Sequence, residues 1–347
     1  MSKPLRHFPG IWGLTLMVLL FLLAFAACLS LAVGSADIRI LDIPEILMAG
    51  LNTDAANPQQ GIQYGILTGI RLPRMLLGLA IGGALGLAGT LLQGMFKNPL
   101  VEPYTLGISG GASLGICLNI LLKLYTHIGI IAFPLSGFAG ASMVIFLVYG
   151  LNRRTRHIRS NRMLLTGVMI SYVASSLVML LMALAETDDL QNIVLWIMGS
   201  LDEPDMVLIR MALMGSVAGL ILSYLFCFDL NGLLLGEEEA ANLGVNTTRT
   251  KKGVFFIASF LTGLSVSVAG IIMFVGLIVP HFMRMIVGPD HRILLVVSWL
   301  AGAVFLMLCD VLARTIIAPM ELPVGVITGI IGGVIFIWAI SSKKEAV

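Results

Sequence analysis

Residues 11–36, IWGLTLMVLLFLLAFAACLSLAVGSA, contain no charged side chain. A helix of about 20 apolar residues crosses the roughly 30 Å hydrocarbon core of a bilayer, so this stretch predicts a membrane-spanning helix. A transmembrane β-strand would instead alternate apolar and polar residues over about ten positions, and no such alternation occurs here. The stretch therefore favours an all-α membrane protein over an outer-membrane barrel.

The composition of the whole chain leads to the same class of protein. Of its 347 residues, 58% are apolar and 12% are charged, whereas a soluble domain averages about 25% charged residues. At roughly 20 apolar residues a span, the apolar content is enough for about ten spans. The composition excludes a soluble enzyme, a nucleic-acid-binding domain and a disordered chain. A net charge of +2 is too small to indicate a polyanionic partner such as nucleic acid.

Charge-free runs locate most of ten expected spans, which cover residues 11–34, 72–95, 105–123, 127–150, 162–186, 206–228, 252–275, 277–288, 293–317 and 322–341. Two of them are less clean, because 277–288 contains Arg284 and 293–317 contains Asp310 and Arg314. We therefore predict a polytopic membrane protein with a single transmembrane domain over residues 1–347. The first run is longer than the roughly 7–15 residues of a signal-peptide core, which favours a retained helix over a cleaved signal.

The basic residues indicate the orientation of these spans, because Lys and Arg collect in cytoplasmic loops. The densest cluster follows the fourth span and contains Arg153, Arg154, Arg156, Arg159 and Arg162. If this loop is cytoplasmic, the other basic segments fall on the same side: Lys3 with Arg6, Arg249 with Lys251 and Lys252, and Lys343 with Lys344. The acidic stretches 186–189 and 202–205 then face outward. Both termini are expected in the cytoplasm.

Two stretches share a pattern of small residues and proline. Residues 82–99 read GGALGLAGTLLQGMFKNP and residues 263–280 read GLSVSVAGIIMFVGLIVP, with Ala-Gly and a later proline at matching positions. The second span is expected to run inward and the seventh outward, so the halves at about 1–200 and 201–347 would be inverted, as in many transporters. A chance match of so few residues is the alternative.

Glycines recur every fourth position in two of the spans. Gly78, Gly82 and Gly86 lie in the second span, and Gly325, Gly329 and Gly333 lie in the last. This spacing places small residues along one helix face, where another helix can approach closely. We expect helix packing within the chain, with a contact between subunits as the alternative.

Three arginines are expected on the outer side, where basic residues are normally sparse. Arg71 and Arg74 begin the second span, and Arg314 lies near the outer end of the ninth, one turn after Asp310. They could reach lipid headgroups or pair within the chain, for instance Arg314 with Asp310. The functional hypothesis is a basic docking patch for an acidic partner.

The longest cytoplasmic loop contains a short charged segment, residues 235–245, that ends near Gly244 and has the pattern of a helix. Glu237 and Glu238 supply charge, and Ala240, Ala241 and Leu243 form an expected apolar edge. A lone surface helix is one interpretation. A helix that a cytoplasmic partner binds is the other.

Motifs of catalysis are missing from the sequence. The chain contains no G-x-x-x-x-G-K-[ST] or H-E-x-x-H sequence. Its cysteines, Cys28, Cys117, Cys227 and Cys309, lie far apart in apolar runs and have no metal-ligand spacing. We expect no catalytic residue, no metal site and no cofactor bound by this chain.

The motifs that are present resemble those of the FecCD family. RLPR at 71–74, NPLVEP at 98–103 and LGISGGA at 106–112 form the first group, and GIIMFVGLIVPHFMR at 270–284, GPDHR at 288–292 and ELPVG at 321–325 form the second. Members of this family are permease subunits of type II ATP-binding-cassette importers for ferric siderophores, haem and cobalamin. The first seventy residues match only as a span followed by an outer loop.

This resemblance implies partners and roles for particular residues. A member would form a homodimer, with two cytoplasmic ATPases that bind ATP and Mg and with a periplasmic or lipid-anchored binding protein, in the bacterial inner membrane. By position, Arg71, Arg74 and Arg314 would dock the binding protein. Asn98 and Leu100, with Ser160 and Asn161, would belong to the cytoplasmic gate. The coupling-helix loop at about 231–250, with Leu235, Gly236, Glu237, Glu238, Ala240, Ala241, Leu243 and Gly244, would contact the ATPase. Val101 stands where the family more often has alanine.

Two other classes of function compete with this hypothesis. A stand-alone secondary transporter normally buries ionisable residues at mid-membrane for ion coupling, and this sequence has almost none there. An intramembrane enzyme would need a catalytic pair. The sequence therefore favours a transport subunit that is not itself an enzyme, without indicating which iron chelate or corrin it carries.

Overall fold

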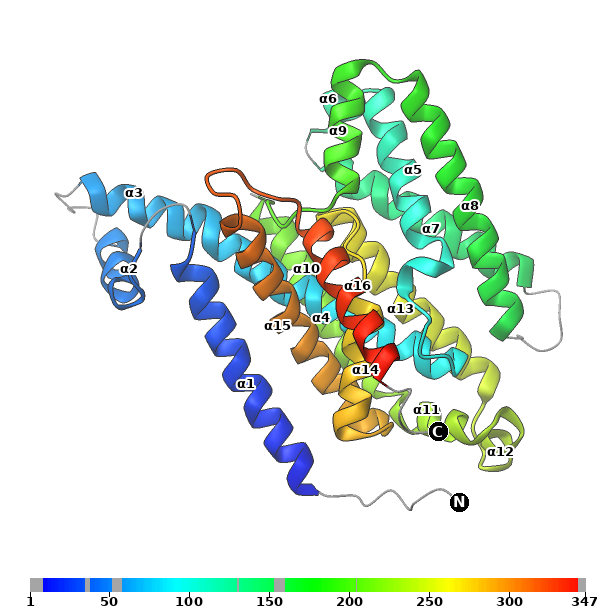
Figure 1. Cartoon of the computed structure of the whole chain (residues 1–347). Coiled ribbons are helices and arrows are strands. Elements are labelled where there is room, and N and C mark those ends of the chain that lie inside the picture. Colours follow the sequence, from blue (N-terminus) through cyan, green and yellow to red (C-terminus); the bar gives the residue numbers. More distant parts are fainter. Residues whose placement is uncertain are drawn as a thin grey trace.

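The computed structural model describes residues 9–34, 38–51, 58–129, 131–152, 160–203 and 205–342, and within these ranges it contains helices and turns but no β-strand (Figure 1). The α-helices are α1 (Pro9–Ala32), α2 (Ile43–Leu51), α3 (Pro58–Ile66), α4 (Leu72–Phe96), α5 (Ile108–Leu121), α6 (Tyr125–Ile128), α7 (Ala132–Asn152), α8 (Ser160–Leu184), α9 (Thr187–Ile197), α10 (Met206–Tyr224), α11 (Cys227–Leu235), α12 (Glu237–Asn242), α13 (Thr247–Ala269), α14 (Val275–Val287), α15 (His291–Thr315) and α16 (Val324–Ser342). Three shorter elements are η1 (Ile40–Asp42), the π-helical η2 (Leu67–Arg71) and η3 (Pro103–Leu106).

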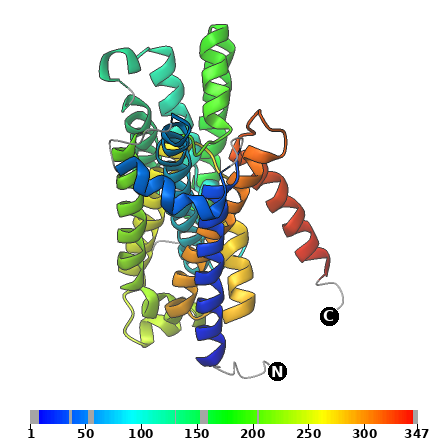
Figure 2. The ribbon, with the colours of Figure 1, turned by 90° about the vertical axis from the view of Figure 1, so that its left-hand side faces the viewer.

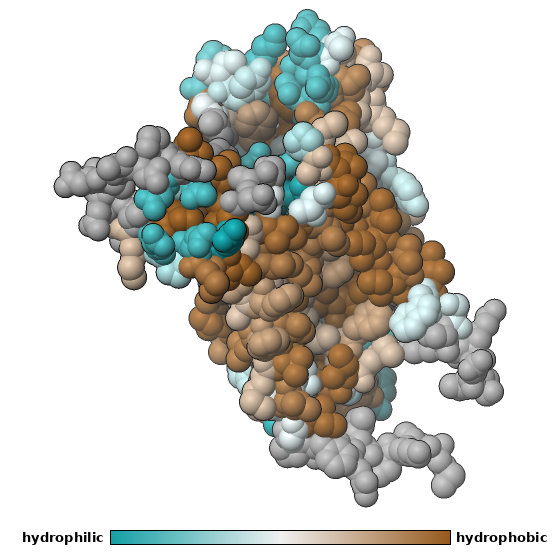
Figure 3. Space-filling view, turned by 60° about the vertical axis from the view of Figure 1, so that its left-hand side comes forward, coloured by the Kyte–Doolittle hydropathy of each residue, from teal (hydrophilic) through white to brown (hydrophobic). Residues whose placement is uncertain are grey.

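The predicted class of an all-α membrane protein is confirmed. In the described part of the chain, seven helical segments are long and apolar enough to cross a membrane, and three apolar helices are shorter: Ile108–Leu121, Val275–Val287 and Val324–Ala339. Each of these segments overlaps one of the expected spans in sequence position. The space-filling view shows a broad apolar surface over the middle of the molecule and hydrophilic residues towards its upper end (Figure 3).

The helix boundaries differ from the prediction in two ways. The second span is longer, because η2 joins α3 to α4 in one helical segment, Gln60–Phe96. The third span is shorter, and the seventh both begins and ends earlier than predicted, at Thr247–Ala269. The chain breaks at Gly107 (φ 82°) before α5, and again between Gly270 (φ 70°) and Phe274 (φ 68°) before α14. A positive φ is costly for residues other than glycine, so neither break can be read from hydropathy alone.

Helix α4 is the centre of the molecule. Most of its side chains are buried, including Leu77, Leu85 and Leu91. Its glycines allow α15 to approach closely. A Cβ atom at Gly82 would overlap the carbonyl oxygen of Gly302, and one at Gly86 would lie 2.5 Å from that of Ser298. A Cβ atom at Gly78 would lie 3.0 Å from the side-chain Cγ of Met307. The second-span glycines thus lie at a helix contact within the chain.

The glycines of the last span pack less uniformly. Gly325 lies against the carbonyl oxygens of Met198 and Ile271. A Cβ atom at Gly329 or at Gly333 would have one neighbouring atom within 4 Å, at 3.9 Å. Gly332, which the fourfold spacing omits, is the tightly packed one, against Phe274. The spacing therefore identifies the packed face of α4 better than that of α16.

Several polar segments gather at one end of the molecule. The beginning of α1 and the α11–α12 segment lie at the same end in two views (Figures 1 and 2). Trp12 Nε1 donates a hydrogen bond to the Val287 carbonyl oxygen at 3.3 Å, which places the α14–α15 turn there too. We call this end the α12 end. The segments α3, α6 and α9 lie towards the other end (Figure 1).

Candidate functional site

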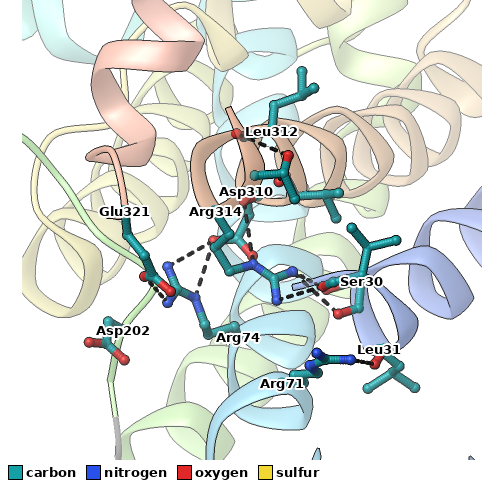
Figure 4. A network of polar contacts seen from close by, with 12 residues as sticks. Ser30, Leu31, Arg71, Arg74, Asp202, Asp310, Leu312, Arg314 and Glu321 are labelled. Atoms are coloured by element: carbon teal, nitrogen blue, oxygen red, sulfur yellow. Dashed lines mark hydrogen bonds and ion pairs between the residues drawn. The ribbon is translucent and has the colours of Figure 1, made fainter. Parts of the chain in front are cut away.

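The three arginines predicted for docking come together at the end of α15 that is far from α12. Arg71 ends η2, Arg74 lies in the first turn of α4, and Arg314 lies in the last turn of α15 (Figure 4). Their residues are only 2%, 4% and 4% exposed. Such burial is tolerated when each charged group is paired or hydrogen-bonded.

Asp310 is the centre of this arginine cluster, which consists of Arg71, Arg74, Asp310, Arg314 and Glu321. Its carboxylate lies 3.3 Å from Arg74 Nη2 and 2.9 Å from Arg314 Nε. Arg74 Nη1 also lies 2.5 Å from Glu321 Oε2, in the segment between α15 and α16. Asp310 is 1% exposed, while the Glu321 side chain is 44% exposed. The cluster therefore has a buried carboxylate at its centre and one that reaches solvent.

The arginines also hold the end of α1. Arg71 Nη1 donates to the carbonyl oxygens of Leu31 and Ala32, both at 2.7 Å. Arg314 Nη2 donates to Ser30 Oγ at 3.1 Å. The last turn of a helix leaves carbonyl oxygens without intrahelical partners, and these guanidinium groups satisfy several of them. The pairing of Arg314 with Asp310, one alternative from the sequence, is present in the structure. The docking role stays a prediction, now for side chains that are buried in the single chain.

The segment predicted to couple to an ATPase projects at the α12 end (Figure 1). Gly236 (φ 137°) separates α11 from the six-residue α12, and Gly244 (φ 87°) follows it. Glu237 Oε1 of α12 lies 2.6 Å from Lys251 Nζ of α13. Asp229 Oδ2 accepts a hydrogen bond from Thr250 Oγ1 at 2.7 Å. These contacts hold the segment against the first turns of α13.

The apolar edge of α12 differs from the expectation at one position. Ala240 is fully buried, whereas Ala241 and Leu243 are exposed. Leu243 and Leu235 are 66% and 65% exposed. Both line a hollow of about 760 Å³ with Phe228 and Arg249. Large apolar side chains around a hollow on a polar end of a protein are typical of a binding surface.

The residues assigned to the gate are described only in part. Asn98 Oδ1 accepts a hydrogen bond from the Leu100 amide at 2.9 Å, which shapes the turn after α4. Leu100 is 56% exposed. Ser160 and Asn161 begin α8, and their side chains lie outside the described part of the structure, as do the basic residues at 153–159.

One buried contact was missed by the sequence reasoning. Glu102 Oε1 accepts a hydrogen bond from the amide of Phe274 at 2.6 Å, and Tyr104 Oη accepts one from the amide of Ile272 at 3.2 Å. The segment before α5 therefore contacts the segment before α14, and a carboxylate satisfies an amide at the start of α14. The available signal was Glu102 itself, a carboxylate between two prolines in an apolar stretch.

The described residues contain no group of three or more His, Cys, Asp or Glu side chains that could hold a metal ion. Their chemistry is that of helix packing, buried ion pairs and an exposed apolar surface at one polar end. Taken with the apolar belt, these features define the class of the protein as a multi-pass helical membrane protein.

Comparison with known proteins identifies the family. The family model of the FecCD transport family matches residues 22–342. The chain is 37% identical over 323 residues to the hemin transport system permease protein HmuU of Yersinia pestis, covering 91% of this chain and 93% of that protein. It is 38% identical over 322 residues to the Fe(3+) dicitrate transport system permease protein FecD of Escherichia coli strain K12, covering 93% and 97%.

A solved structure agrees with these relatives. An inward-facing conformation of a metal-chelate type ABC transporter matches with a TM-score of 0.80 and 29% identity, over 95% of this chain and 99% of that one. The chain belongs to the FecCD transport family, whose members are permeases of ABC importers. The resemblance drawn from the sequence motifs is confirmed.

Proposed function

We propose that two copies of this chain form the membrane channel of an importer that moves a ferric siderophore, haem or cobalamin across a bacterial cytoplasmic membrane. Two cytoplasmic ATPase subunits bind ATP and Mg and drive the movement, and a periplasmic or lipid-anchored binding protein delivers the substrate. The relatives named above carry hemin and ferric dicitrate permease names, which supports an iron chelate as the first substrate class to test.

The observation that carries this proposal is the exposed α11–α12 segment. It offers the exposed apolar side chains of Leu235 and Leu243 at a hollow of mixed polarity, and it is fixed to α13 by the Glu237–Lys251 ion pair. A surface that receives force from a partner needs both an apolar contact and a stiff attachment to the transmembrane helices. This segment has both, and its end of the molecule is then the cytoplasmic end.

Leu243→Asp tests the ATPase contact. A charge in the centre of an apolar interface is costly to desolvate, so co-purification of the ATPase with the chain should fall about tenfold or more. The matched control is Leu41→Asp, because Leu41 is 89% exposed in η1 and lies outside this surface. Normal association in Leu243→Asp would place the coupling surface elsewhere.

We further propose that the outer end receives the binding protein at the arginine cluster. Arg74 already has a solvent-reaching carboxylate partner in Glu321. A carboxylate of an acidic partner therefore has a route to the same guanidinium, by replacing Glu321. Arg71 and Arg314 contribute positive charge close by, which raises the association rate of an acidic partner.

The gate and the two inverted halves complete the proposal. Asn98 and Leu100 belong to the turn after α4, and with Ser160 and Asn161 they form the cytoplasmic gate. Helices α5 and α14 have 14 and 13 residues, and each directly follows a residue with a positive φ, Gly107 or Phe274. These corresponding breaks support halves at about 1–200 and 201–347, which meet where Glu102 contacts Phe274.

A further inference from the structure

The α11–α12 segment has a second attachment, to the beginning of α15. Asn231 of α11 donates a hydrogen bond through Nδ2 to Asp290 Oδ1 at 2.8 Å. Its Oδ1 accepts one from the His291 amide at 2.8 Å and lies 2.9 Å from His291 Nδ1. Both polar atoms of one side chain are therefore used on the α14–α15 turn. We call Asn231, Asp290 and His291 the α11–α15 joint.

The carboxylate of the joint is charged at physiological pH. Burial opposes the charge, but hydrogen bonds from Arg292 and Asn231 outweigh it and lower the pKa of Asp290 to about 2. Asp290 also caps α15 by accepting from the Arg292 amide at 3.0 Å. A hydrogen bond to a charged group is roughly twice as strong as one between neutral groups. The Asn231–Asp290 bond is accordingly a strong contact.

A cation supports the joint on the surface. The Arg292 guanidinium lies 5.7 Å from the ring centroid of Trp12 in α1 and 5.9 Å from that of Phe228 in α11. Cation–π contacts at this distance are attractive. Arg292 thus connects α11, α15 and α1 at one point.

The joint continues into the central helix. His291 is fully buried, and its Nε2 lies against Gly94 near the end of α4, where a Cβ atom would come within 2.5 Å. Cores packed this closely transmit displacement rather than absorb it. A shift of α11 therefore reaches α15 through Asn231 and reaches α4 through His291.

We infer that Asn231 is the positioning residue that makes α11–α12 and the first turn of α15 move as one body when the ATPase binds and hydrolyses ATP. This inference rests on the proposed role of α12 as the ATPase contact. It adds that α15 and α4, and not only α13, receive the movement. Without the joint, α11–α12 would move with α13 while α15 stayed behind.

The test compares distances across the joint in the complex with the ATPase in nanodiscs. Spin labels replace Leu234 of α11 and Ile286 of α14, which are 38% and 51% exposed, with Cys28→Ser removing the exposed native cysteine. Wild type should give one narrow distance that is unchanged between nucleotide-free and vanadate-trapped states.

Asn231→Asp places a second carboxylate next to that of Asp290 and removes the Nδ2 donor of the hydrogen bond between them. The population with a longer, nucleotide-dependent distance should rise about tenfold, as expected for loss of one charge-assisted hydrogen bond. Adding Asp290→Asn restores a donor and an acceptor in exchanged places across this contact and should return the narrow distance. Because Asp290 Oδ1 also accepts from the Arg292 amide, the double variant weakens the cap of α15, and thermal unfolding of the double variant measures that cost separately. The control Asn192→Asp makes the same chemical change at an exposed position in α9 and should change nothing.

The outcomes separate this inference from the proposed function. An unchanged narrow distance in Asn231→Asp in both nucleotide states would overturn the inference, and so would a failure of Asp290→Asn to rescue it. Co-purification of the ATPase should fall less in Asn231→Asp than in Leu243→Asp, because Leu243 and Leu235 are untouched while Asn231 lines the edge of the same hollow. Association that is insensitive to Leu243→Asp would instead contradict the proposed function.

Discussion

Replacing Asp310 by Asn should destabilise the protein more than any other single change in the arginine cluster. The substitution keeps the shape of the side chain but removes the negative charge between Arg74 and Arg314, at 3.3 and 2.9 Å. Both arginines are 4% exposed, so their repulsion is weakly screened by water. Removing one partner of a buried ion pair costs about 3–5 kcal/mol because an uncompensated buried charge remains.

The loss of stability expected for Asp310→Asn can be compared with the loss expected at Glu321. Glu321 pairs with the same Arg74, but its side chain is 44% exposed, and exposed pairs contribute about 0–1 kcal/mol. Glu321→Gln should therefore cost a small fraction of what Asp310→Asn costs. Both changes replace a carboxylate by an amide. The difference between their losses of stability therefore reports the effect of burying the ion pair.

Thermal unfolding in detergent, followed by intrinsic fluorescence, measures both variants. Asp310→Asn should lower the midpoint by about 5–10 °C, and Glu321→Gln by about 2 °C or less. Asp42→Asn, at an exposed position in η1, serves as the matched control and should match wild type. A midpoint for Asp310→Asn within about 2 °C of wild type, or a larger effect at Glu321, would refute the interpretation of the cluster as a buried ion-pair network.

Packing at α4 and the exposure of Glu321 give two further predictions. Gly86→Ala should destabilise the chain by about 1–3 kcal/mol through overpacking against Ser298 of α15. The control Gly329→Ala should be neutral, because the position has open space around it. Equal midpoints of the two variants in thermal unfolding would contradict the packing described for α4. Glu321→Gln should raise the affinity of the binding protein for this chain by up to about tenfold, because Arg74 no longer pairs with Glu321 and can pair with a carboxylate of the partner. Surface plasmon resonance measures this affinity. An unchanged or lower affinity would argue against docking at this cluster.

The sequence was sufficient to predict the class and most of the helices. A charge-free run long enough to cross a bilayer indicates a span regardless of the tertiary structure around it. The predicted bounds of α1, α8 and α10 therefore lie within a few residues of the observed ones. The breaks before α5 and α14 were not predicted, because they depend on backbone conformations at Gly107 and Phe274 and on the contact of Phe274 with Glu102. The short helices α2, α3 and α9 lie outside the apolar runs and carry no comparable signal.

The residues of the candidate site could be predicted from the sequence, but their contacts with one another could not. Spacing within one helix indicated that Arg314 could meet Asp310. No local pattern could show that Arg74, 236 positions away in the chain, meets the same carboxylate, or that these arginines are buried. The same limit applies to Asn231, which meets Asp290 only because α11 folds back against α15. The sequence supplied the polar residues, and tertiary packing selected their partners.

Our central claim is that this chain is a transport subunit whose movement is driven by partner ATPases. Reconstitution of the chain with its ATPase in proteoliposomes, with haem and a ferric hydroxamate chelate as probes and the binding protein outside, tests this most directly. We predict uptake that requires ATP and Mg on the ATPase side and that disappears in Leu243→Asp. Uptake by the chain alone, driven by a proton or sodium gradient and indifferent to ATP, would contradict the claim and favour a secondary transporter.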